Sequence, residues 1–151
     1  MANNKAQEIA ASLCKRFEGC RLSPYLCPAG VPTIGYGATY YEGGRKVRLD
    51  DVSISQEYAE ELLLWHLENI YIPTAIRLCP NIDSVEKLAA IVDFVFNLGG
   101  NNLKNSTLRI KILEDDWEGA ITQLRRWVRA SGKVLRGLVL RREAEIELIK
   151  E

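Results

Sequence analysis

Glu18 is the residue of this sequence best placed to perform chemistry, because it stands where a predicted helix ends and a glycine-rich strand follows. Residues 31–36 are expected to form that strand. Its alternation places small or polar residues on one face: Thr33, Gly35 and the following Gly37. Glycine weakens a strand, and one reason for its presence is the close approach of a ligand to the backbone. A single carboxyl group facing such a strand suggests a cleft.

The position of Glu18 in the last turn of its helix bears on its charge. The negative end of the helix dipole disfavours an anion there, which favours the protonated form that a proton donor needs. Lys15, one turn earlier, favours the charged form instead. On helix position alone, an ordinary surface glutamate is the simpler interpretation.

The helix that carries Glu18 is predicted from an apolar repeat with helical spacing. The repeat consists of Ala6, Ile9, Ala10, Leu13 and Phe17. Asn3 or Asn4 could cap the start of this helix, and Gly19 could end it in the left-handed conformation.

A small antiparallel sheet of two or three short strands is expected next. Ser23-Pro24 and residues 27–30 are turn signals on either side of a short segment. Residues 40–47 are expected to form a hairpin bent at Gly43 and Gly44. The strands are thereby confined to the first third of the chain.

The remainder of the chain predicts helices. Ser55 is expected to cap a long helix that reaches Leu78 and is kinked or split near Tyr71 by Pro73. Residues 85–98 are apolar almost all round, as expected of a buried central helix. Further helices are expected over residues 107–113, 117–128 and 137–149. The predicted fold class is therefore α+β and mostly helical.

The composition describes one globular domain of 151 residues, with 47% apolar and 26% charged residues. A chain of this size buries roughly 70% of the surface that its unfolded form exposes, so a substantial core is expected. Twenty acidic and twenty basic residues balance, which argues against a nucleic-acid-binding protein. Seven Lys or Arg and no acidic residue lie between Arg125 and Arg142. This run is either a solvated helix surface or a region that attracts an anionic polymer.

The N-terminus has neither the basic segment nor the apolar run of a signal peptide, and no stretch has the roughly 18 apolar residues of a membrane span. The chain is therefore expected in the cytoplasm, without stable membrane association. The four cysteines are Cys14, Cys20, Cys27 and Cys79, with no Cys-x-x-Cys pair. We expect free thiols, no metal and no cofactor, although Cys14 and Cys20 could form a disulfide after export. His66, the only histidine, is expected to be structural.

Glu18, Cys27 and Thr33 are separated by eight and five residues, and Ile-Gly-Tyr-Gly follows Thr33 at once. This spacing is similar to the catalytic signature of the phage-type lysozymes, the endolysin muramidases of glycoside hydrolase family 24. The C-terminal half resembles the family in order and spacing over residues 96–99, 106–108, 126–127, 130–135, 137–138 and 141–142. The similarity covers nearly the whole chain.

The resemblance implies a lysozyme-like fold in a single domain over residues 1–151. An N-terminal lobe over about 15–55 would hold the sheet, and a linking helix over about 56–78 would join it to a helical lobe over about 79–151, on which the first helix packs. The cleft would lie between the sheet and the helices. Such an endolysin hydrolyses the β-1,4 bond between N-acetylmuramic acid and N-acetylglucosamine in bacterial peptidoglycan and causes host cell lysis.

The catalytic residues that the resemblance implies are Glu18, Cys27 and Thr33. Glu18 would protonate the glycosidic oxygen and Thr33 would position the attacking water, with inversion of configuration. Many members of the family have Asp where this chain has Cys27, and a neutral thiol would give up most of the roughly 3 kcal/mol that a carboxylate contributes. Cys27 is therefore a thiolate, a nucleophile or a small apolar filler, or else Thr33 and substrate binding carry more of the rate.

Five further residues are expected to contact the substrate: Gly35, Tyr36, Asn97, Ser106 and Arg142. Asn97 lies at a helix end, where its amide suits hydrogen bonds to an N-acetyl group. Arg142 resembles an arginine that pairs with the catalytic glutamate, with Arg141 as the neighbouring candidate. Ala38 stands where the family often has His, so a polar contact made by other members is missing.

The resulting prediction is a monomeric endolysin whose partner is peptidoglycan, an anionic polymer that the basic run Arg125–Arg142 would attract. It would accumulate in the host cytoplasm and reach the periplasm or cell wall through a lesion made by a separate membrane-permeabilising protein. A non-catalytic peptidoglycan-binding protein and a lytic transglycosylase are alternatives on the same fold. A thiol-redox protein using Cys14 or Cys20 is disfavoured by the lack of a Cys-x-x-Cys pair.

Overall fold

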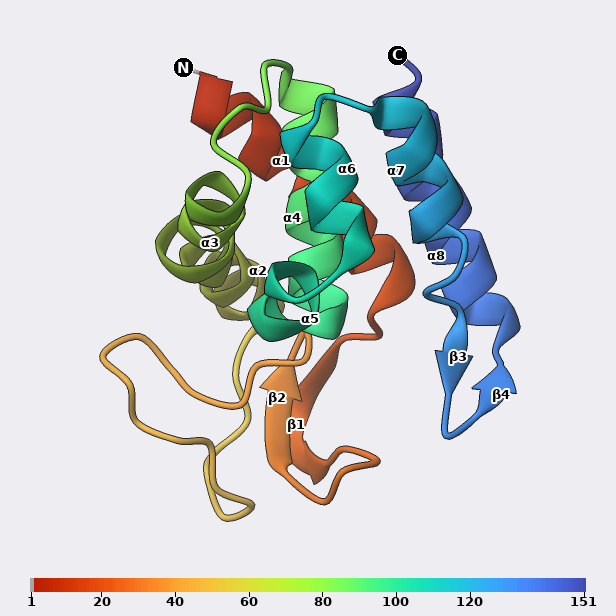
Figure 1. Cartoon of the computed structure of the whole chain (residues 1–151). Coiled ribbons are helices and arrows are strands. Elements are labelled where there is room, and N and C mark those ends of the chain that lie inside the picture. The colour runs from red at the N-terminus through yellow and green to blue at the C-terminus, as the bar shows by residue number, and fades with distance from the viewer. Residues whose placement is uncertain (1) are drawn as a thin grey trace.

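The computed structural model describes residues 2–151, with side chains from residue 3 onward, as a group of helices from which two small β-hairpins project (Figure 1). The helices are α1 (Ala2–Phe17), α2 (Gln56–His66), α3 (Ile72–Leu78), α4 (Val85–Leu98), α5 (Gly100–Lys104), α6 (Thr107–Leu113), α7 (Trp117–Leu124) and α8 (Arg136–Ile149), with a π-helical segment, Leu67–Tyr71, between α2 and α3. The strands are β1 (Arg21–Leu26), β2 (Pro32–Gly35), β3 (Arg129–Ala130) and β4 (Lys133–Val134). The predicted α+β class, mostly helical, is confirmed.

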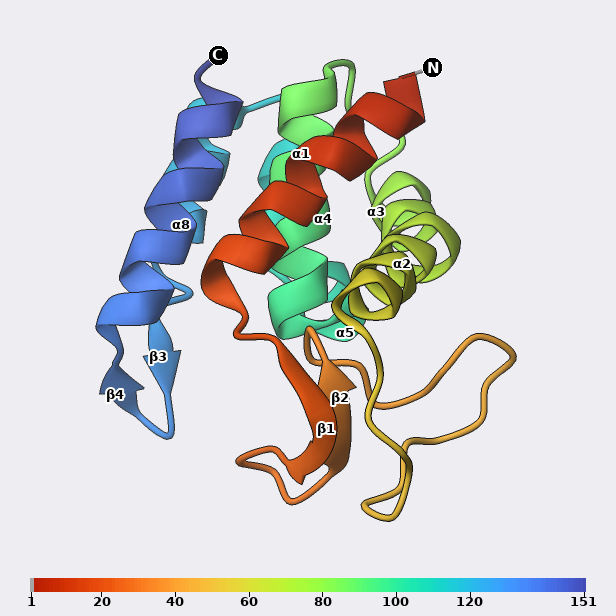
Figure 2. The ribbon, with the colours of Figure 1, turned by 180° about the vertical axis from the view of Figure 1, so that it is seen from behind.

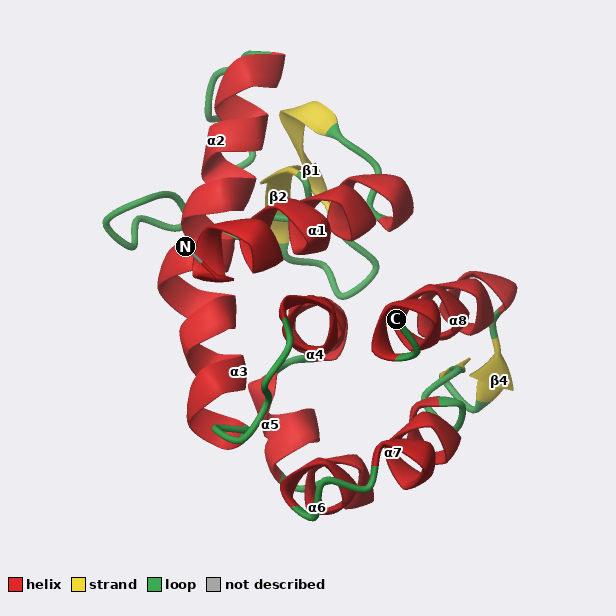
Figure 3. Cartoon of the chain, turned by 90° about the horizontal axis from the view of Figure 1, so that it is seen from above, coloured by secondary structure: helices red, strands yellow, loops and turns green. Residues whose placement is uncertain are grey.

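Helix α4 is the centre of the fold, and the other helices surround it when the molecule is seen from above (Figure 3). Its residues from Leu88 to Val95 are all buried. Because apolar residues cover nearly its whole circumference, this helix is stable only with neighbours on several sides. Helices α1 and α8 make the most extensive contacts with it. The predicted central helix is confirmed, and it buries one charged residue, Asp93.

Helix α1 leads the chain into the first hairpin (Figure 2). Glu18 is the residue that follows its last residue, Phe17. Its core-facing side chains include Ala6, Ala10 and Cys14, all fully buried. Two predictions about its ends are wrong. Asn3 and Asn4 lie inside the helix and do not cap it, and Gly19 is not among the residues with positive φ. The chain extends directly into β1, so no left-handed residue is needed.

The first hairpin pairs β1 and β2 in antiparallel fashion, with Tyr25 opposite Thr33. Ser23-Pro24, predicted to form a turn, lies inside β1. The register is interrupted between Arg21 and Tyr25, and an irregular edge strand tolerates proline because no partner needs its missing N–H. The turn prediction failed because a Ser-Pro dipeptide suits an irregular edge strand as well as a turn.

A third strand does not form in this region of the described chain. The predicted hairpin over residues 40–47 is reduced to one isolated bridge, between Tyr40 and Lys46. A second, smaller cluster of buried apolar residues lies here: Ile34, Val47 and Leu62. This cluster anchors the loops beside the sheet to α2, separately from the main core. The division of the chain into two lobes and a linking helix stays a prediction.

The long helical segment begins and breaks where the sequence predicts. The Ser55 side chain accepts a hydrogen bond from the Tyr58 backbone N–H at 3.0 Å, as an N-cap does. The segment changes to π-helical geometry over Leu67–Tyr71 and returns to α-helix in α3, which has Pro73 in its first turn. Proline lacks an N–H and crowds the preceding turn, which accounts for the break near Tyr71.

The C-terminal half contains one helix and one hairpin that the sequence analysis missed. Helix α5 is a single short helix after Gly99, whose φ of 89° requires glycine. The helix predicted over residues 117–128 ends at Leu124 instead, and the second hairpin, β3–β4, follows it over residues 129–134. None of the described helices combines the length and the apolarity that crossing a bilayer requires.

Candidate active site

Glu18 is held at the junction between α1 and β1. Its backbone N–H donates to the carbonyl of Cys14 at 2.8 Å, which completes the last turn of α1. Its Oε2 lies 2.6 Å from Nη1 of Arg141 in α8, and its side chain is 27% exposed. One residue from each end of the chain therefore meets here, and the carboxyl group remains accessible to a ligand.

A glycine turn after β2 lies beside the other carboxylate oxygen of Glu18. Gly35 and Gly37 have φ of 65° and 82°, and Ile34 and Ala38 pair across this turn through two backbone hydrogen bonds. A side chain at Gly37 would place its Cβ 3.5 Å from Oε1 of Glu18. Glycine is needed at both positions for the positive φ.

The predicted contact of Gly35 with substrate stays a prediction. A Cβ on this buried residue would lie 3.7 Å from the side chains of Ala59 and Ile54. These are ordinary van der Waals distances, so the positive φ of Gly35 is what explains a glycine here.

Cys27 begins the loop that joins β1 to β2. Its backbone N–H donates to the Val31 carbonyl at 3.1 Å, and its own carbonyl accepts from the Gly30 N–H at 2.8 Å. The backbone N–H of Val31 has the largest effect on the Cys27 thiol and lowers its pKa; burial opposes this shift, and the backbone N–H of Ala29 adds to it. Each of these donors stabilises the thiolate. The loop thus favours the reactive form of the sulfur.

Thr33 lies on β2, on the same face as Tyr25, which it opposes across the hairpin. Alternation along β1 brings Cys27, two residues after Tyr25, to that face as well. The Thr33 hydroxyl donates to the Val31 carbonyl at 2.8 Å, and the residue is only 2% exposed. Its oxygen keeps lone pairs that can accept a hydrogen bond from a water or a thiol.

A buried network of charges supports Glu18 from behind. Arg141 donates from Nε to Oδ2 of Asp93 at 2.9 Å and from Nη2 to Oδ1 at 2.7 Å. Burial alone would lower the pKa of Arg141, but Asp93 raises it above its ordinary value. Burial likewise opposes the charge of Asp93, but the hydrogen bonds from Arg141 lower its pKa. Arg141 is thus a fixed cation shared by two carboxyl groups, those of Asp93 and Glu18.

The thiol of Cys14 also belongs to this network, because its Sγ donates to Oδ1 of Asp93 at 3.5 Å. Burial first, and then the Asp93 charge, raise the pKa of this thiol. Cys14 is therefore a neutral hydrogen-bond donor in the core. Within the described residues, all four cysteines are free.

Comparison with known proteins agrees with this arrangement. The model of the Phage lysozyme family matches residues 15–145. The chain belongs to the phage lysozyme family. It is 37% identical over 132 residues to a SAR-endolysin of Bacteriophage PS119, covering 85% of this chain and 74% of the relative. It is 35% identical over 144 residues to an endolysin of Acyrthosiphon pisum secondary endosymbiont phage 1, covering 91% of this chain and 92% of the relative.

Among solved structures, the endolysin of the Escherichia coli O157:H7 phage FAHEc1 superposes with a TM-score of 0.81 at 26% identity, over 93% of this chain and 90% of that one. Membership of the phage lysozyme family confirms the predicted lysozyme-like fold. It also confirms the prediction of a glycosidase of the endolysin type that hydrolyses peptidoglycan.

The arginine that pairs with Glu18 in this phage lysozyme is Arg141, and the preference for Arg142 is wrong. Arg142 is fully buried and turns the other way, donating from Nη2 to Oδ1 of Asn97 at 2.8 Å and to Oε2 of Glu145 at 2.9 Å. Successive residues of a helix point about 100° apart, so only one of the two can reach Glu18. Buried in this way, Arg142 cannot touch a substrate.

Glu145 completes the buried part of the network. Its Oε1 lies 2.8 Å from Nε of Arg142, but the two atoms are not aligned for a hydrogen bond. Burial first, and then the neighbouring Asp93, raise the pKa of Glu145 well above its ordinary value, although Arg142 opposes the shift. The core therefore holds two arginines against Asp93 as the principal anion.

The other predicted contact residues have structural tasks in this state. Asn97 accepts from Arg142 and is half-buried. Ser106 caps α6, accepting from the Arg109 N–H at 3.0 Å, and donates to the Leu103 carbonyl. Tyr36, at the tip of the glycine turn, accepts a hydrogen bond at 2.9 Å. Their contact with substrate stays a prediction.

The sequence analysis missed Asp93. Its signal was available, because Asp93 is the one charge in the stretch of α4 that is otherwise apolar, and a charge in a buried helix needs a partner. Among the described residues, no three His, Cys, Asp or Glu side chains are grouped so as to hold a metal ion.

Proposed function

We propose that this chain cleaves the β-1,4 bond between N-acetylmuramic acid and N-acetylglucosamine, with Glu18 as the proton donor. The observation that carries the proposal is the position of the Glu18 carboxyl group. One of its oxygens is fixed at 2.6 Å by Arg141, and the group is still 27% exposed at the start of the first hairpin. The substrate would lie between the sheet and the helices, bridged by the segment from α2 to α3.

The cation that holds Glu18 is shared with a second carboxyl group, that of Asp93. Asp93 lies 2.7 Å from the same guanidinium and offsets much of its charge as seen from Glu18. Once the proton has passed to the glycosidic oxygen, Arg141 stabilises the carboxylate that remains. The arginine therefore holds the group in place in both protonation states.

On the other side of the sugar, Cys27 and Thr33 would serve the attacking water. A thiolate at Cys27 would stabilise the positive charge that develops at the anomeric carbon. Thr33, whose hydroxyl hydrogen is directed to Val31, would accept a hydrogen bond from the water. Its low exposure requires that substrate binding or a small movement of the loop opens access to it.

The site of action would be the peptidoglycan of the periplasm or cell wall. We infer that the enzyme reaches it from the host cytoplasm through a lesion made by a separate protein and acts as a monomer. The relatives named SAR-endolysin support action outside the cytoplasm and leave the route open.

The products of purified peptidoglycan test the proposal. After digestion, borohydride reduction and mass spectrometry, a muramidase gives reduced muramic acid ends. Anhydro ends would instead assign a lytic transglycosylase, and reduced glucosamine ends a glucosaminidase. Absence of any new ends with the wild type would leave only wall binding.

A further inference from the structure

The second hairpin, β3–β4, is the most exposed segment of the C-terminal half. Every residue from 129 to 137 is exposed. The hairpin turns at Ser131 and Gly132, whose φ values of 51° and 78° are those of a tight two-residue turn that matches the strand twist. Its short strands pair Arg129 with Val134 and Ala130 with Lys133.

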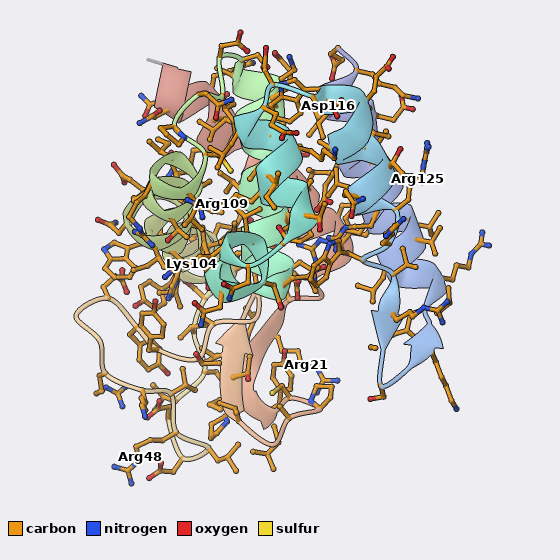
Figure 4. The ribbon with its side chains drawn as sticks, viewed as in Figure 1. Arg21, Arg48, Lys104, Arg109, Asp116 and Arg125 are labelled. Carbon is orange, nitrogen blue, oxygen red and sulfur yellow. The ribbon has the colours of Figure 1, made fainter. Side chains whose placement is uncertain are left out.

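The base of this hairpin is firmly attached to the fold. The backbone N–H of Leu135 donates to the Val128 carbonyl at 2.9 Å and closes the base. Nη1 of the buried Arg142 donates to the Trp127 carbonyl at 3.3 Å. Arg125 pairs with Glu143 of α8 at 3.0 Å, and Figure 4 shows Arg125 at the side of α7, above the hairpin. The exposed tip is therefore carried on a fixed support.

The basic run of the sequence divides into two groups in the structure. Arg125, Arg141 and Arg142 are engaged by acidic side chains of the fold. The other four have no ion-pair partner within residues 3–151: Arg126, which precedes the hairpin, and Arg129, Lys133 and Arg136, which lie on or next to it. Exposed cations without acidic neighbours attract an anionic partner at low cost, because little existing pairing is lost.

One of these cations, Arg136, lies on the same helix as Arg141, the partner of Glu18. Arg136 opens α8, and Arg141 follows five residues later, an axial rise of about 8 Å. Figures 1 and 2 show the molecule from opposite sides, and in both of them the two hairpins project from the same end of the helices. Arg21 of β1 lies on the side toward the second hairpin in Figure 4, and its guanidinium stacks on Tyr25. Cations therefore lie on both hairpins that project from this end of the molecule.

We propose that the β3–β4 hairpin is a basic arm that binds the carboxylates of the peptide stems carried by the glycan strand, an assignment that rests on the proposed function. The neutral sugars of the strand offer hydrogen bonds, whereas the stems carry most of its negative charge. Arg129 and Lys133 lie on opposite faces of the arm, so that it can engage stems on either side. The arm would raise the affinity for intact wall and leave the bond-breaking step to Glu18.

The arm is tested by binding, in an enzyme that cannot hydrolyse its ligand. In a Glu18→Gln background, Arg129→Gln, Lys133→Gln and Arg136→Gln are combined, and the Kd for purified sacculi is measured by co-sedimentation. The matched control combines Lys5→Gln, Arg77→Gln and Lys150→Gln, three exposed cations on other elements. Both sets are compared on native sacculi and on sacculi whose carboxylates have been amidated with a carbodiimide and ammonia.

We expect the arm variant to bind native sacculi about 10-fold more weakly, since each exposed pair contributes a few-fold at most. The control should change by about twofold or less, and on amidated sacculi the two variants should bind alike. An equal loss of affinity in the control variant would overturn the proposal. So would a loss of affinity in the arm variant that persists on amidated sacculi, because the ligand would then be a phosphate or another anion. Release of new sugar ends by the enzyme with Glu18 intact is measured separately, so failure of the proposed function is distinguished from failure of the arm.

Discussion

The two halves of the candidate site are built in different ways. Glu18 is held by Arg141, which is itself fixed by Asp93 in the centre of α4, so that its support reaches into the main core. Cys27 and Thr33 lie on a two-stranded hairpin and are held by backbone hydrogen bonds of one short loop. The proton donor thus depends on side chains distant in sequence, whereas the opposite half depends on local geometry.

This difference indicates which half tolerates substitution. A buried ion pair is costly to break, because the remaining charge is left without a partner in a medium of low polarity. A loop held by its own backbone keeps its shape when one side chain changes. We therefore expect substitutions around Glu18 to affect both folding and activity, and substitutions at Cys27 to affect activity alone.

The largest expected effect is that of Glu18→Gln. The amide cannot donate a proton to the glycosidic oxygen, so turnover of purified peptidoglycan should fall by about 10²–10⁴-fold, the usual contribution of a general acid. Glu68→Gln, which removes an exposed carboxylate of the π-helical segment, is the matched control and should keep full activity. Equal clearing of permeabilised Gram-negative cells by the wild type and the Glu18 variant would exclude Glu18 as the donor.

The second effect concerns the support of Glu18. Asp93→Ala leaves Arg141 buried with one carboxyl partner, and it should lower the free energy of unfolding by about 3–5 kcal/mol, measured by denaturant titration. Asp83→Ala removes an exposed carboxylate near the start of the same helix, 3.9 Å from Lys87, and should cost less than about 1 kcal/mol. Similar losses in the two variants would show that the buried network does not support the site.

The sequence predicted the fold well where local chemistry decides it. The Ser55 cap, the break before Pro73 and the apolar circumference of α4 each follow from a few neighbouring residues. Predictions failed where two local signals compete. Ser23-Pro24 suits a turn as well as an irregular edge strand, and the helix predicted to reach residue 128 ends at Leu124.

The candidate site was predictable only in its local half. Glu18, Cys27 and Thr33 share one spacing motif, and Thr33 and Cys27 share one hairpin. The partner of Glu18 lies 123 residues away, and which of two adjacent arginines reaches it depends on the rotation of α8 against α4. Sequence spacing carries no information about that rotation, so Arg142 was preferred over Arg141.

The third effect tests the local half through Cys27. Cys27→Ala removes the thiolate and should reduce turnover by up to about 100-fold, whereas Cys27→Asp should restore much of it, because the charge then returns. Both variants should unfold at the same denaturant concentration as the wild type. Cys20→Ala, at a second half-buried cysteine, is the control and should keep its activity. Full activity of Cys27→Ala would mean that the thiol is only a filler.

The thiol of Cys27 should also be the more reactive one. Because the loop lowers its pKa, a larger fraction is thiolate at neutral pH, and iodoacetamide should modify Cys27 before Cys20. Mass spectrometry of partly alkylated protein gives the order. Modification of Cys20 first would contradict the thiolate assignment.

The smallest expected effect is that of His66, which lies in α2 and packs against the loop beside the sheet. This residue is 4% exposed and packs edge-on against Tyr40, with ring centroids 4.7 Å apart. Its Nδ1 lies 2.9 Å from the Leu62 carbonyl, and its Nε2 is buried without a hydrogen-bond partner among the described residues. A cavity of about 30 Å³ adjoins the ring and reaches Ala38, which is enough room for one water molecule.

Burial lowers the pKa of His66 below its usual value near 6.5, so the folded state favours the neutral ring. The stability that this preference contributes is therefore complete above about pH 6.5 and is lost as the pH falls through the lowered pKa. The Tm of the wild type should consequently fall between pH 7 and pH 5 more steeply than that of His66→Phe, which does not titrate, and the difference between them should be constant above pH 7. Parallel Tm curves across that whole range would show that protonation of His66 does not weaken the contact between the sheet region and the helices.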